Sequence, residues 1–384
     1  MPSDLRNLTA THSIVNLFDY ERLAKARLTK MTFDYYASGA MDEITVRANH
    51  RAYDEIYLRY RALAGVGTRD ASTSVLGHKM TMPVLVAPTA FHCLAHPLGE
   101  RATAQAAAAA GVIYVMSTLS NTLMEDVASV SAGPRWFQLY VFKDRGVTQS
   151  LVQRAEAAGY TALELTVDAP KLGQREADVR NQFYLPDGLT VANVVASQLG
   201  EVTSMGGGSG LATYFVRLLD ENLTWRDVEW LRSITKLPVL IKGICRGDDA
   251  KHAIASGVGG IIVSNHGGRQ LDGALSSIAA LPSIVRTVGD RMEIFLDGGV
   301  RSGQDVLKAV ALGARAVFIG RAFLYGVQAL GGEGVTLALE IIRKELDLTM
   351  ALCGCRDIRR VDRSIIESRD ETHELGIKHE LRSQ

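Results

Sequence analysis

The chain has 384 residues, of which 47% are hydrophobic, so it can bury a large core as one large α/β domain or as two ordinary ones. Lysine plus arginine and aspartate plus glutamate number 42 each, which gives a formal net charge of zero. This balance gives no electrostatic reason to expect nucleic acid or an anionic membrane as partner, so we expect a small ligand.

The four cysteines, Cys93, Cys245, Cys353 and Cys355, form no disulfide framework, and no arginine-then-apolar leader opens the sequence. We therefore expect a cytoplasmic protein. A single residue separates Cys353 from Cys355, which is not the spacing of a metal site, so we expect no metal. No run of about twenty apolar residues is present to span a bilayer.

Residues 1–80 are predicted to be mainly helical and to cap the rest of the fold. Short apolar runs bounded by turn residues then recur, and helical periodicity separates most of them, as in 99–109, 147–158 and 305–312. The eight runs are 82–88, 111–117, 136–141, 162–168, 237–243, 260–265, 293–299 and 316–321.

This alternation of strands and helices predicts parallel β-α units, and eight units predict an α/β fold, the (β/α)8 TIM barrel. We expect one domain over 1–384, with the barrel in 81–331 and C-terminal helices and a tail in 332–384. An open doubly wound sheet is the alternative. The number of units disfavours it, as does the lack of Gly-x-Gly-x-x-Gly after the first strand.

The connection between the fourth and fifth runs is much longer than the others and contains the glycine-rich tract 205–210. A segment of this length and composition favours an excursion over the barrel mouth. Two interpretations of the loop 197–212 are open: a lid that closes on substrate, or a surface loop without a role.

Polar residues stand where the first five strands end. In a barrel, the carboxyl ends of all strands meet at one face, where active sites are built. A structural hydrogen bond is the alternative explanation for each residue taken alone, but agreement among several strand ends favours a site. The polar residues are Thr89, Ser117, Gln138, Tyr140, Thr166, Asp168 and Lys242, and Ala90 follows Thr89 at the end of the first run.

The sixth strand is followed by the stretch Ser264–Gly273, which places His266 and Arg269 three residues apart in a glycine-rich loop. A base beside a fixed cation suits a substrate that carries both a removable proton and a carboxylate.

The last two strands are followed by Asp297–Arg301 and by Gly320–Arg321. Glycines expose backbone amides, and each segment adds a guanidinium, which together are the groups that bind a phosphate monoester. In barrels, the loops after strands seven and eight commonly bind phosphate.

With these motifs the chain resembles the FMN-dependent 2-hydroxy-acid oxidases and dehydrogenases, a family that includes glycolate oxidase, lactate oxidase and mandelate dehydrogenase. The resemblance runs from about residue 18 to about residue 365. Its signatures are Phe33–Ala40, Trp136–Tyr140, Leu165–Asp168, Arg175–Glu176, Leu237–Gly243, Ser264–Gly273 and Phe295–Arg301.

The resemblance implies roles for the catalytic and substrate-binding residues. His266 resembles the active-site base, and Asp168 the carboxylate that stabilises its protonated form. Arg175 and Arg269 resemble the clamps on the substrate carboxylate. Further roles follow for Tyr35, which would assist the clamps, for Tyr140, which would hydrogen-bond the substrate hydroxyl, and for Lys242, which would stabilise negative charge on reduced flavin.

The cofactor implied by the resemblance is FMN. The residues implied at its ring and ribityl chain are Thr89, Ala90, Ser117, Gln138, Thr166, Lys242 and Ser264. Those implied at the ribityl and phosphate end are Asp297, Gly299, Arg301, Gly320 and Arg321.

The reaction implied is oxidation of an (S)-2-hydroxy acid to the 2-oxo acid, through either the hydroxyl proton or the α-proton. Oxygen is the expected acceptor, giving hydrogen peroxide, because the chain has no N-terminal haem domain and the insert after Pro186 is too short and polar for a membrane anchor. The alternative is a dehydrogenase that uses a quinone or a carrier protein. A homotetramer is also expected from the family.

L-Lactate is the first substrate expected, followed by glycolate and by larger or aromatic acids such as mandelate. Leu119 stands where glycolate oxidases carry tryptophan, and Ala90 where mandelate dehydrogenases tend to have glycine. Phe91 and Tyr214 are expected to close the pocket. One methylene shifts preference by only about 1–3 kcal/mol, so overlap is expected.

Two other classes of protein fit a barrel with a phosphate site. One is a sugar-phosphate isomerase or nucleotide dehydrogenase without flavin, which would be colourless when purified. The other is a non-catalytic ligand-binding or scaffolding barrel, which gives no reason for His266, Asp168, Arg175 and Arg269 to share one rim.

Overall fold

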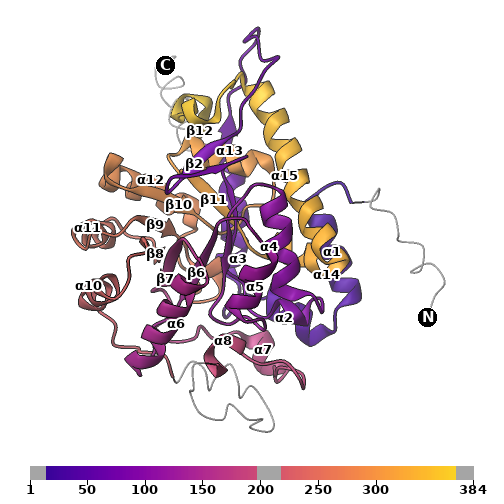
Figure 1. Ribbon diagram of the computed structural model, residues 1–384. Coiled ribbons are helices and arrows are strands. Elements are labelled where there is room, and N and C mark those ends of the chain that lie inside the picture. Colours follow the sequence, from indigo (N-terminus) through magenta and orange to yellow (C-terminus); the bar gives the residue numbers. More distant parts are fainter. Residues whose placement is uncertain (1–13, 197–217, 369–384) are drawn as a thin grey trace, which may run out of the picture.

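Eight parallel strands close into a barrel in the computed structural model, which describes residues 14–196 and 218–368 (Figure 1). The barrel closes where the last strand pairs with the first, with Phe318 opposite Leu85. The predicted (β/α)8 fold is thereby confirmed. In barrel order the strands are β4 (Val84–Val86), β5 (Tyr114–Met116), β6 (Arg135–Leu139), β7 (Ala162–Thr166), β8 (Val239–Ile244), β9 (Gly260–Val263), β10 (Glu293–Leu296) and β11 (Ala316–Ile319).

Helices surround the barrel and alternate with its strands (Figure 1). Their starts follow from local sequence. In α13, for example, the Ser302 side chain accepts from the Asp305 amide while the Asp305 carboxylate accepts from the Ser302 amide. The barrel helices are α4 (Gly99–Ala109), α5 (Met124–Val130), α6 (Arg145–Ala157), α10 (Trp225–Ser233), α11 (Gly247–Ala255), α12 (Ser277–Val288), α13 (Gly303–Ala311) and α14 (Arg321–Leu330). Two short helices, α7 (Glu176–Arg180) and α8 (Ala192–Val195), lie between β7 and β8.

The N-terminal cap is helical only in its first part, in α1 (Leu17–Arg27), α2 (Lys30–Ala37) and α3 (Ile44–Asp54). After α3 it continues as short strands rather than as the expected helices. Strand β1 (Ile56–Leu58) pairs with β12 (Ile366–Ser368), and β2 (Thr73–Val75) forms a hairpin with β3 (His78–Met80). The C-terminal region has one long helix, α15 (Gly332–Cys353). The 3-10 turns are η3 (His92–Leu94), η4 (His266–Gly268), η5 (Gly289–Arg291), η6 (Ile358–Arg360) and η7 (Arg363–Ile365).

Three aromatic rings fill the interior of the barrel. Trp136, Phe295 and Phe318 are buried, with ring centroids 5.8 to 6.2 Å apart. Their edge-on and tilted packing is the arrangement that aromatic rings favour. These rings occupy the interior below the carboxyl ends of the strands, and the carboxyl ends are where barrels bind their ligands.

The segment 197–212, for which a lid was one interpretation, lies outside the described residues, as does Tyr214. Within the described residues, none of the helices combines the length and the apolar character that crossing a membrane requires. In the same part of the chain, no group of three or more His, Cys, Asp or Glu side chains is arranged to hold a metal ion.

Candidate active site

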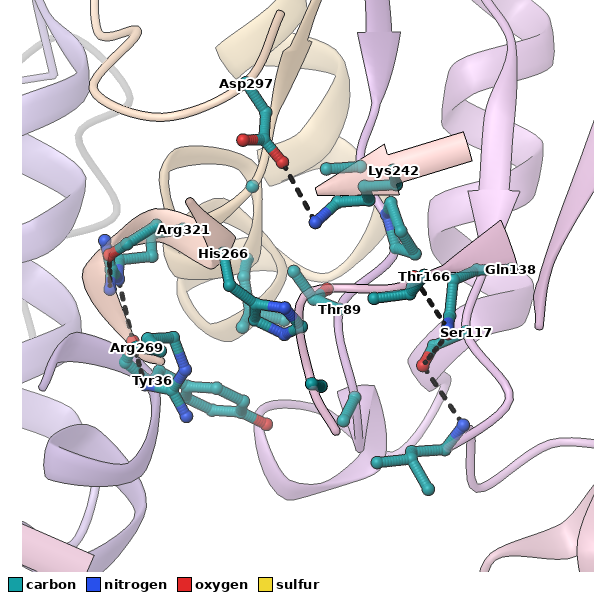
Figure 2. Close-up of a pocket in the computed structure, with 18 of the residues that line it drawn as sticks. Tyr36, Thr89, Ser117, Gln138, Thr166, Lys242, His266, Arg269, Asp297 and Arg321 are labelled. Atoms are coloured by element: carbon teal, nitrogen blue, oxygen red, sulfur yellow. Dashed lines mark hydrogen bonds and ion pairs between the residues drawn. The ribbon is translucent and has the colours of Figure 1, made fainter. Parts of the chain in front are cut away.

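A cavity opens at the carboxyl ends of the barrel strands, and most of the residues predicted for the site line it (Figure 2). Asp168 and Ser264 are the two predicted residues outside its lining, and each contacts a residue that belongs to it. The predicted residues in the lining are Tyr35, Thr89, Ala90, Ser117, Gln138, Tyr140, Thr166, Arg175, Lys242, His266, Arg269, Asp297, Gly299, Arg301, Gly320 and Arg321.

His266 and Asp168 form a hydrogen-bonded pair, with 2.8 Å between Nδ1 of the imidazole and Oδ1 of the carboxylate. Burial lowers the pKa of His266 and outweighs the opposing effect of Asp168. Burial alone would raise the pKa of Asp168, but His266 and Lys242 lower it overall. The pair therefore combines a neutral imidazole with an ionised carboxylate, which is the state a general base requires.

Gly243 makes room for Asp168. Its φ is +110°, and a Cβ atom at this position would lie 2.6 Å from the Asp168 Cβ and 2.8 Å from its Cγ. Only glycine accommodates both the backbone angle and the close approach. The end of β8 thus fixes where the carboxylate after β7 can stand.

The loop that carries His266 is held by the N-terminal cap. Asn265 and Asn49 exchange two side-chain hydrogen bonds of 2.8 and 2.9 Å, and the Ala40 amide donates to the Gly268 carbonyl. His266 itself has a φ of +58°, which lies in the left-handed region. This conformation is energetically unfavourable for a residue that has a Cβ atom. The surrounding contacts hold this strained conformation in place.

Lys242 is a buried cation between a hydroxyl and a carboxylate, and Figure 2 shows its contact with the carboxylate of Asp297. Its Nζ lies 3.0 Å from the Ser264 Oγ and 3.3 Å from Oδ2 of Asp297. Burial alone would lower the pKa of Lys242, but Asp297 and the other nearby carboxyl groups raise it. Oδ1 of Asp297 is buried without a hydrogen-bond partner, so an acceptor remains for a ligand.

A row of polar side chains crosses the wall of the cavity from β5 to β7 (Figure 2). The Ser117 Oγ donates to Oε1 of Gln138 at 3.2 Å, and Nε2 of Gln138 donates to the Thr166 Oγ1 at 3.0 Å. On the neighbouring strand end, the Thr89 Oγ1 is 2.6 Å from Nε2 of His92. Ser117, Gln138, Thr166 and Thr89 thus line the wall with donors and acceptors whose positions these hydrogen bonds fix.

Two guanidinium groups lie close to each other on the cap side of the cavity. Nη1 of Arg269 donates to the Ser38 carbonyl at 2.6 Å, and its Cζ lies 5.3 Å from the Tyr35 ring centre. Nε of Arg175 is 3.5 Å from the Arg269 carbonyl. Burial and the charge of Arg269 lower the pKa of Arg175 to about 10, which marks a site that an anion would stabilise.

A second cationic region lies after β10 and β11. Nη2 of Arg321 donates to the Gly267 carbonyl at 2.7 Å, and burial together with Arg269 and Arg301 lowers its pKa to about 10. Nε of Arg301 is buried without a partner. Gly299 has a φ of +87°, and a Cβ atom there would lie 2.0 Å from the Asn49 carbonyl oxygen. Two guanidinium groups beside a glycine turn, one of them with an unpartnered buried Nε, fit a phosphate.

Apolar side chains complete the cavity, and sequence reasoning found only some of them. Phe91 and Leu119 were expected near the pocket, whereas Leu172, Val191 and Leu219 were not. The latter three come from the long connection between β7 and β8, where no strand end marks a position. The other lining residues outside the predicted set are Tyr36, Ala87, Pro88, Ala169, Gly267, Gln270, Gly298, Val300, Phe318 and Leu324.

Comparison with known proteins gives a consistent result. Residues 24–368 match the sequence profile of the FMN-dependent dehydrogenases. An L-lactate oxidase from Nostoc sp. is 52% identical over 363 residues, covering 94% of this chain and 100% of the relative. Glycolate oxidase 3 from Arabidopsis thaliana is 49% identical, covering 95% and 99%. A mandelate oxidase structure with (S)-4-hydroxymandelic acid superposes with a TM-score of 0.86 at 41% identity, covering 92% and 99%.

Proposed function

The chain belongs to the family of FMN-dependent dehydrogenases, its cofactor is FMN, and we propose that it oxidises (S)-2-hydroxy acids to 2-oxo acids with oxygen as acceptor. L-Lactate is the first substrate we propose, and hydrogen peroxide the second product. The observation that carries the proposal is the pairing of His266 with Asp168 in the same cavity as the guanidinium groups of Arg175 and Arg269.

The substrate carboxylate binds between Arg175 and Arg269. Both side chains are cationic, and burial together with the charge of Arg269 lowers the pKa of Arg175. An anion bound between the two side chains would stabilise the protonated form of Arg175. Tyr35 and Tyr140 line the same part of the cavity, and burial raises the pKa of both phenols, so each remains a hydrogen-bond donor. We assign Tyr35 to the carboxylate and Tyr140 to the substrate hydroxyl.

His266 takes a proton from the bound substrate. Its imidazole faces the cavity, and the Asp168 carboxylate at 2.8 Å stabilises the imidazolium that forms. Asp168 does not line the cavity, so its role is to orient and charge-balance the base rather than to contact the substrate.

When bound, FMN would supply the acceptor for the two electrons that leave the substrate. The polar row of Ser117, Gln138 and Thr166, with Thr89, Ala90 and Ser264, would hold the ring and the ribityl chain. Lys242 would stabilise the negative charge that reduction places on the ring, because an ammonium buried beside it needs no reorganisation to do so. The residues that would hold the ribityl and phosphate end are Asp297, Gly299, Arg301, Gly320 and Arg321.

The choice of L-lactate rests on the apolar part of the cavity and on the relatives. The lining of the cavity includes the apolar side chains of Phe91, Leu119 and Leu172, which suit a small apolar group. The similarity to an L-lactate oxidase supports the same choice. Glycolate is the second candidate, favoured by the similarity to glycolate oxidases, and an aromatic acid such as mandelate is the third, favoured by the mandelate oxidase structures.

Anaerobic mixing of the yellow protein with a panel of hydroxy acids, followed by admission of air, tests this proposal. L-Lactate is expected to bleach the flavin fastest, and air is expected to restore the colour within the turnover time while hydrogen peroxide accumulates. Bleaching by mandelate but not by L-lactate would contradict the substrate. Slow recolouring in air, accelerated by a quinone, would indicate a dehydrogenase instead.

Cytoplasmic location and assembly into a homotetramer complete the proposal. All four cysteines are free thiols, which supports a reducing compartment. Among the exposed apolar side chains, four lie at or just before the start of α3 and on the loop after η4, which supports burial against another copy. They are Met41 (53% exposed), Ile44 (51%), Leu271 (71%) and Leu275 (57%).

A further inference from the structure

Glu164 is a buried carboxyl group that the proposed reaction does not use. It lies in the middle of β7 with no exposed surface, and neither of its carboxyl oxygens has a hydrogen-bond partner. Side chains alternate along a strand, so Glu164 points to the same side as Thr166, which lines the cavity. It is also paired with Gln138 of β6, another lining residue. Glu164 therefore lies one layer of side chains below the cavity.

Three charged groups act on this carboxyl from different elements. Lys242 of the neighbouring strand β8 favours its ionised form, whereas Asp297 after β10 and Asp168 after β7 oppose it. Burial is the largest effect and raises the pKa of Glu164 to about 8. The other neighbouring strand, β6, carries Arg135. The Arg135 guanidinium donates to backbone carbonyl groups of the loop before β6 and not to Glu164. Glu164 is thus a neutral acid beside a buried ammonium group.

We propose that Glu164 is a redox-linked acid, which is protonated at neutral pH and whose ionisation in alkaline solution lowers the reduction potential of bound FMN. The proposal rests on the family's cofactor and not on the substrate or the electron acceptor. Glu164 acts through its own charge, which changes the electrostatic environment of Lys242. It does not touch the substrate, so it is a positioning residue.

The charge balance explains the direction of the effect. Reduction of FMN by two electrons and one proton leaves one negative charge on the ring system. A second negative charge on Glu164 would oppose this in a buried site, whereas the protonated acid does not. By linkage, reduction must in turn favour protonation of Glu164. Below the pKa of Glu164 the enzyme therefore takes up one proton with two electrons. Above it, and below the higher pKa that Glu164 has in the reduced enzyme, the enzyme takes up two, the second being transferred from solvent to the Glu164 carboxylate.

Potentiometric titration of the substrate-free holoenzyme across neutral and alkaline pH tests the proposal. The slope of the midpoint potential against pH is expected to double above about pH 8 in the unmodified protein. Glu164→Gln keeps the shape of the protonated acid but cannot ionise, so its slope should stay at the one-proton value throughout. A doubled slope that persists in Glu164→Gln, or a single slope in the unmodified protein, would overturn the proposal.

Glu293→Gln is the matched control. Glu293 is also a carboxyl whose pKa is raised by burial, but it stands at the first residue of β10, at the end of the barrel away from the cavity. This variant should retain the doubled slope.

Infrared difference spectra of the unmodified holoenzyme give a second measurement that needs no variant. Above about pH 8, reduction should create a protonated carboxylic acid signal and remove a carboxylate signal. Spectra without these changes would also overturn the proposal. Because neither measurement uses a hydroxy acid, failure to oxidise L-lactate would leave the test of Glu164 intact.

Discussion

Asp168 has a role that a single substitution can isolate. We expect Asp168→Asn to retain FMN, because Asp168 does not line the cavity, and to slow flavin reduction by about 10²- to 10⁴-fold. The physical reason is that the neutral amide cannot stabilise the imidazolium of His266. Stopped-flow absorbance under anaerobic conditions measures the rate. A variant that is reduced at a near-normal rate would show that Asp168 does not assist the base.

His266 also fixes the direction of the pH dependence. The base form of an imidazole exists above its pKa, so activity should rise with pH through that pKa and then level off. Because burial lowers the pKa of His266 from 6.5, the acid limb of kcat/KM should lie below pH 6.5. Steady-state rates between about pH 4.5 and pH 8 measure this limb. An acid limb centred above pH 7 would contradict the assignment.

The sequence was informative about residues that stand at strand ends and uninformative about others. His266, Lys242 and Arg301 could be predicted to lie in one site because each stands at or shortly after the end of a predicted strand, and the carboxyl ends of all barrel strands meet at one face. Glu164 could not, because it stands inside an apolar run and gives no pattern of its own. Val191 came from a segment without periodicity, so its place in the cavity depended on tertiary structure alone.

Strand β8 controls the site through its glycine, which can be tested at the level of this element. We expect Gly243→Ala to lower the free energy of unfolding by about 2–4 kcal/mol and to slow flavin reduction, because the new Cβ atom would displace Asp168. Denaturant unfolding and anaerobic reduction measure the two effects.

Gly77→Ala is the control for backbone strain alone. Gly77 in the β2–β3 hairpin has a φ of +82° and no atom within 4 Å of an added Cβ atom. The Gly77→Ala variant should lower the free energy of unfolding by about 1 kcal/mol and leave the rate of flavin reduction unchanged. Equal loss of activity in both variants would contradict a specific role for the space beside Asp168.

The barrel strands were predictable because strands of a parallel sheet are buried on both faces and read as continuous apolar runs. Each of the eight predicted runs coincides with an observed strand. Six runs contain their strand, whereas β6 begins one residue before its run and β8 ends one residue after its run. Strands β1, β2 and β3 escaped prediction for the opposite reason. Each has three residues of mixed exposure, which is too short to establish a period of two.

For the whole molecule, we expect FMN to stabilise the fold more than riboflavin does. A ligand that binds only the folded state adds about 2.7 kcal/mol at a free concentration of 100 times its Kd. Riboflavin lacks the phosphate that Arg301 and Arg321 would bind, so at equal concentration it should raise the Tm less. Scanning calorimetry of the apoprotein with each flavin measures this. Equal shifts would contradict a phosphate site at these arginines.

The hydrogen bonds between Asn49 and Asn265 join parts of the chain that are more than two hundred residues apart, and the Thr45 amide adds a bond of 2.8 Å to Asp272. The strained turn that presents the imidazole is therefore supported from outside the barrel. One consequence concerns recombination between relatives. A chimera that takes its first fifty residues from one parent and the turn around His266 from another would fold its barrel yet lose turnover, unless both halves of this contact were inherited together.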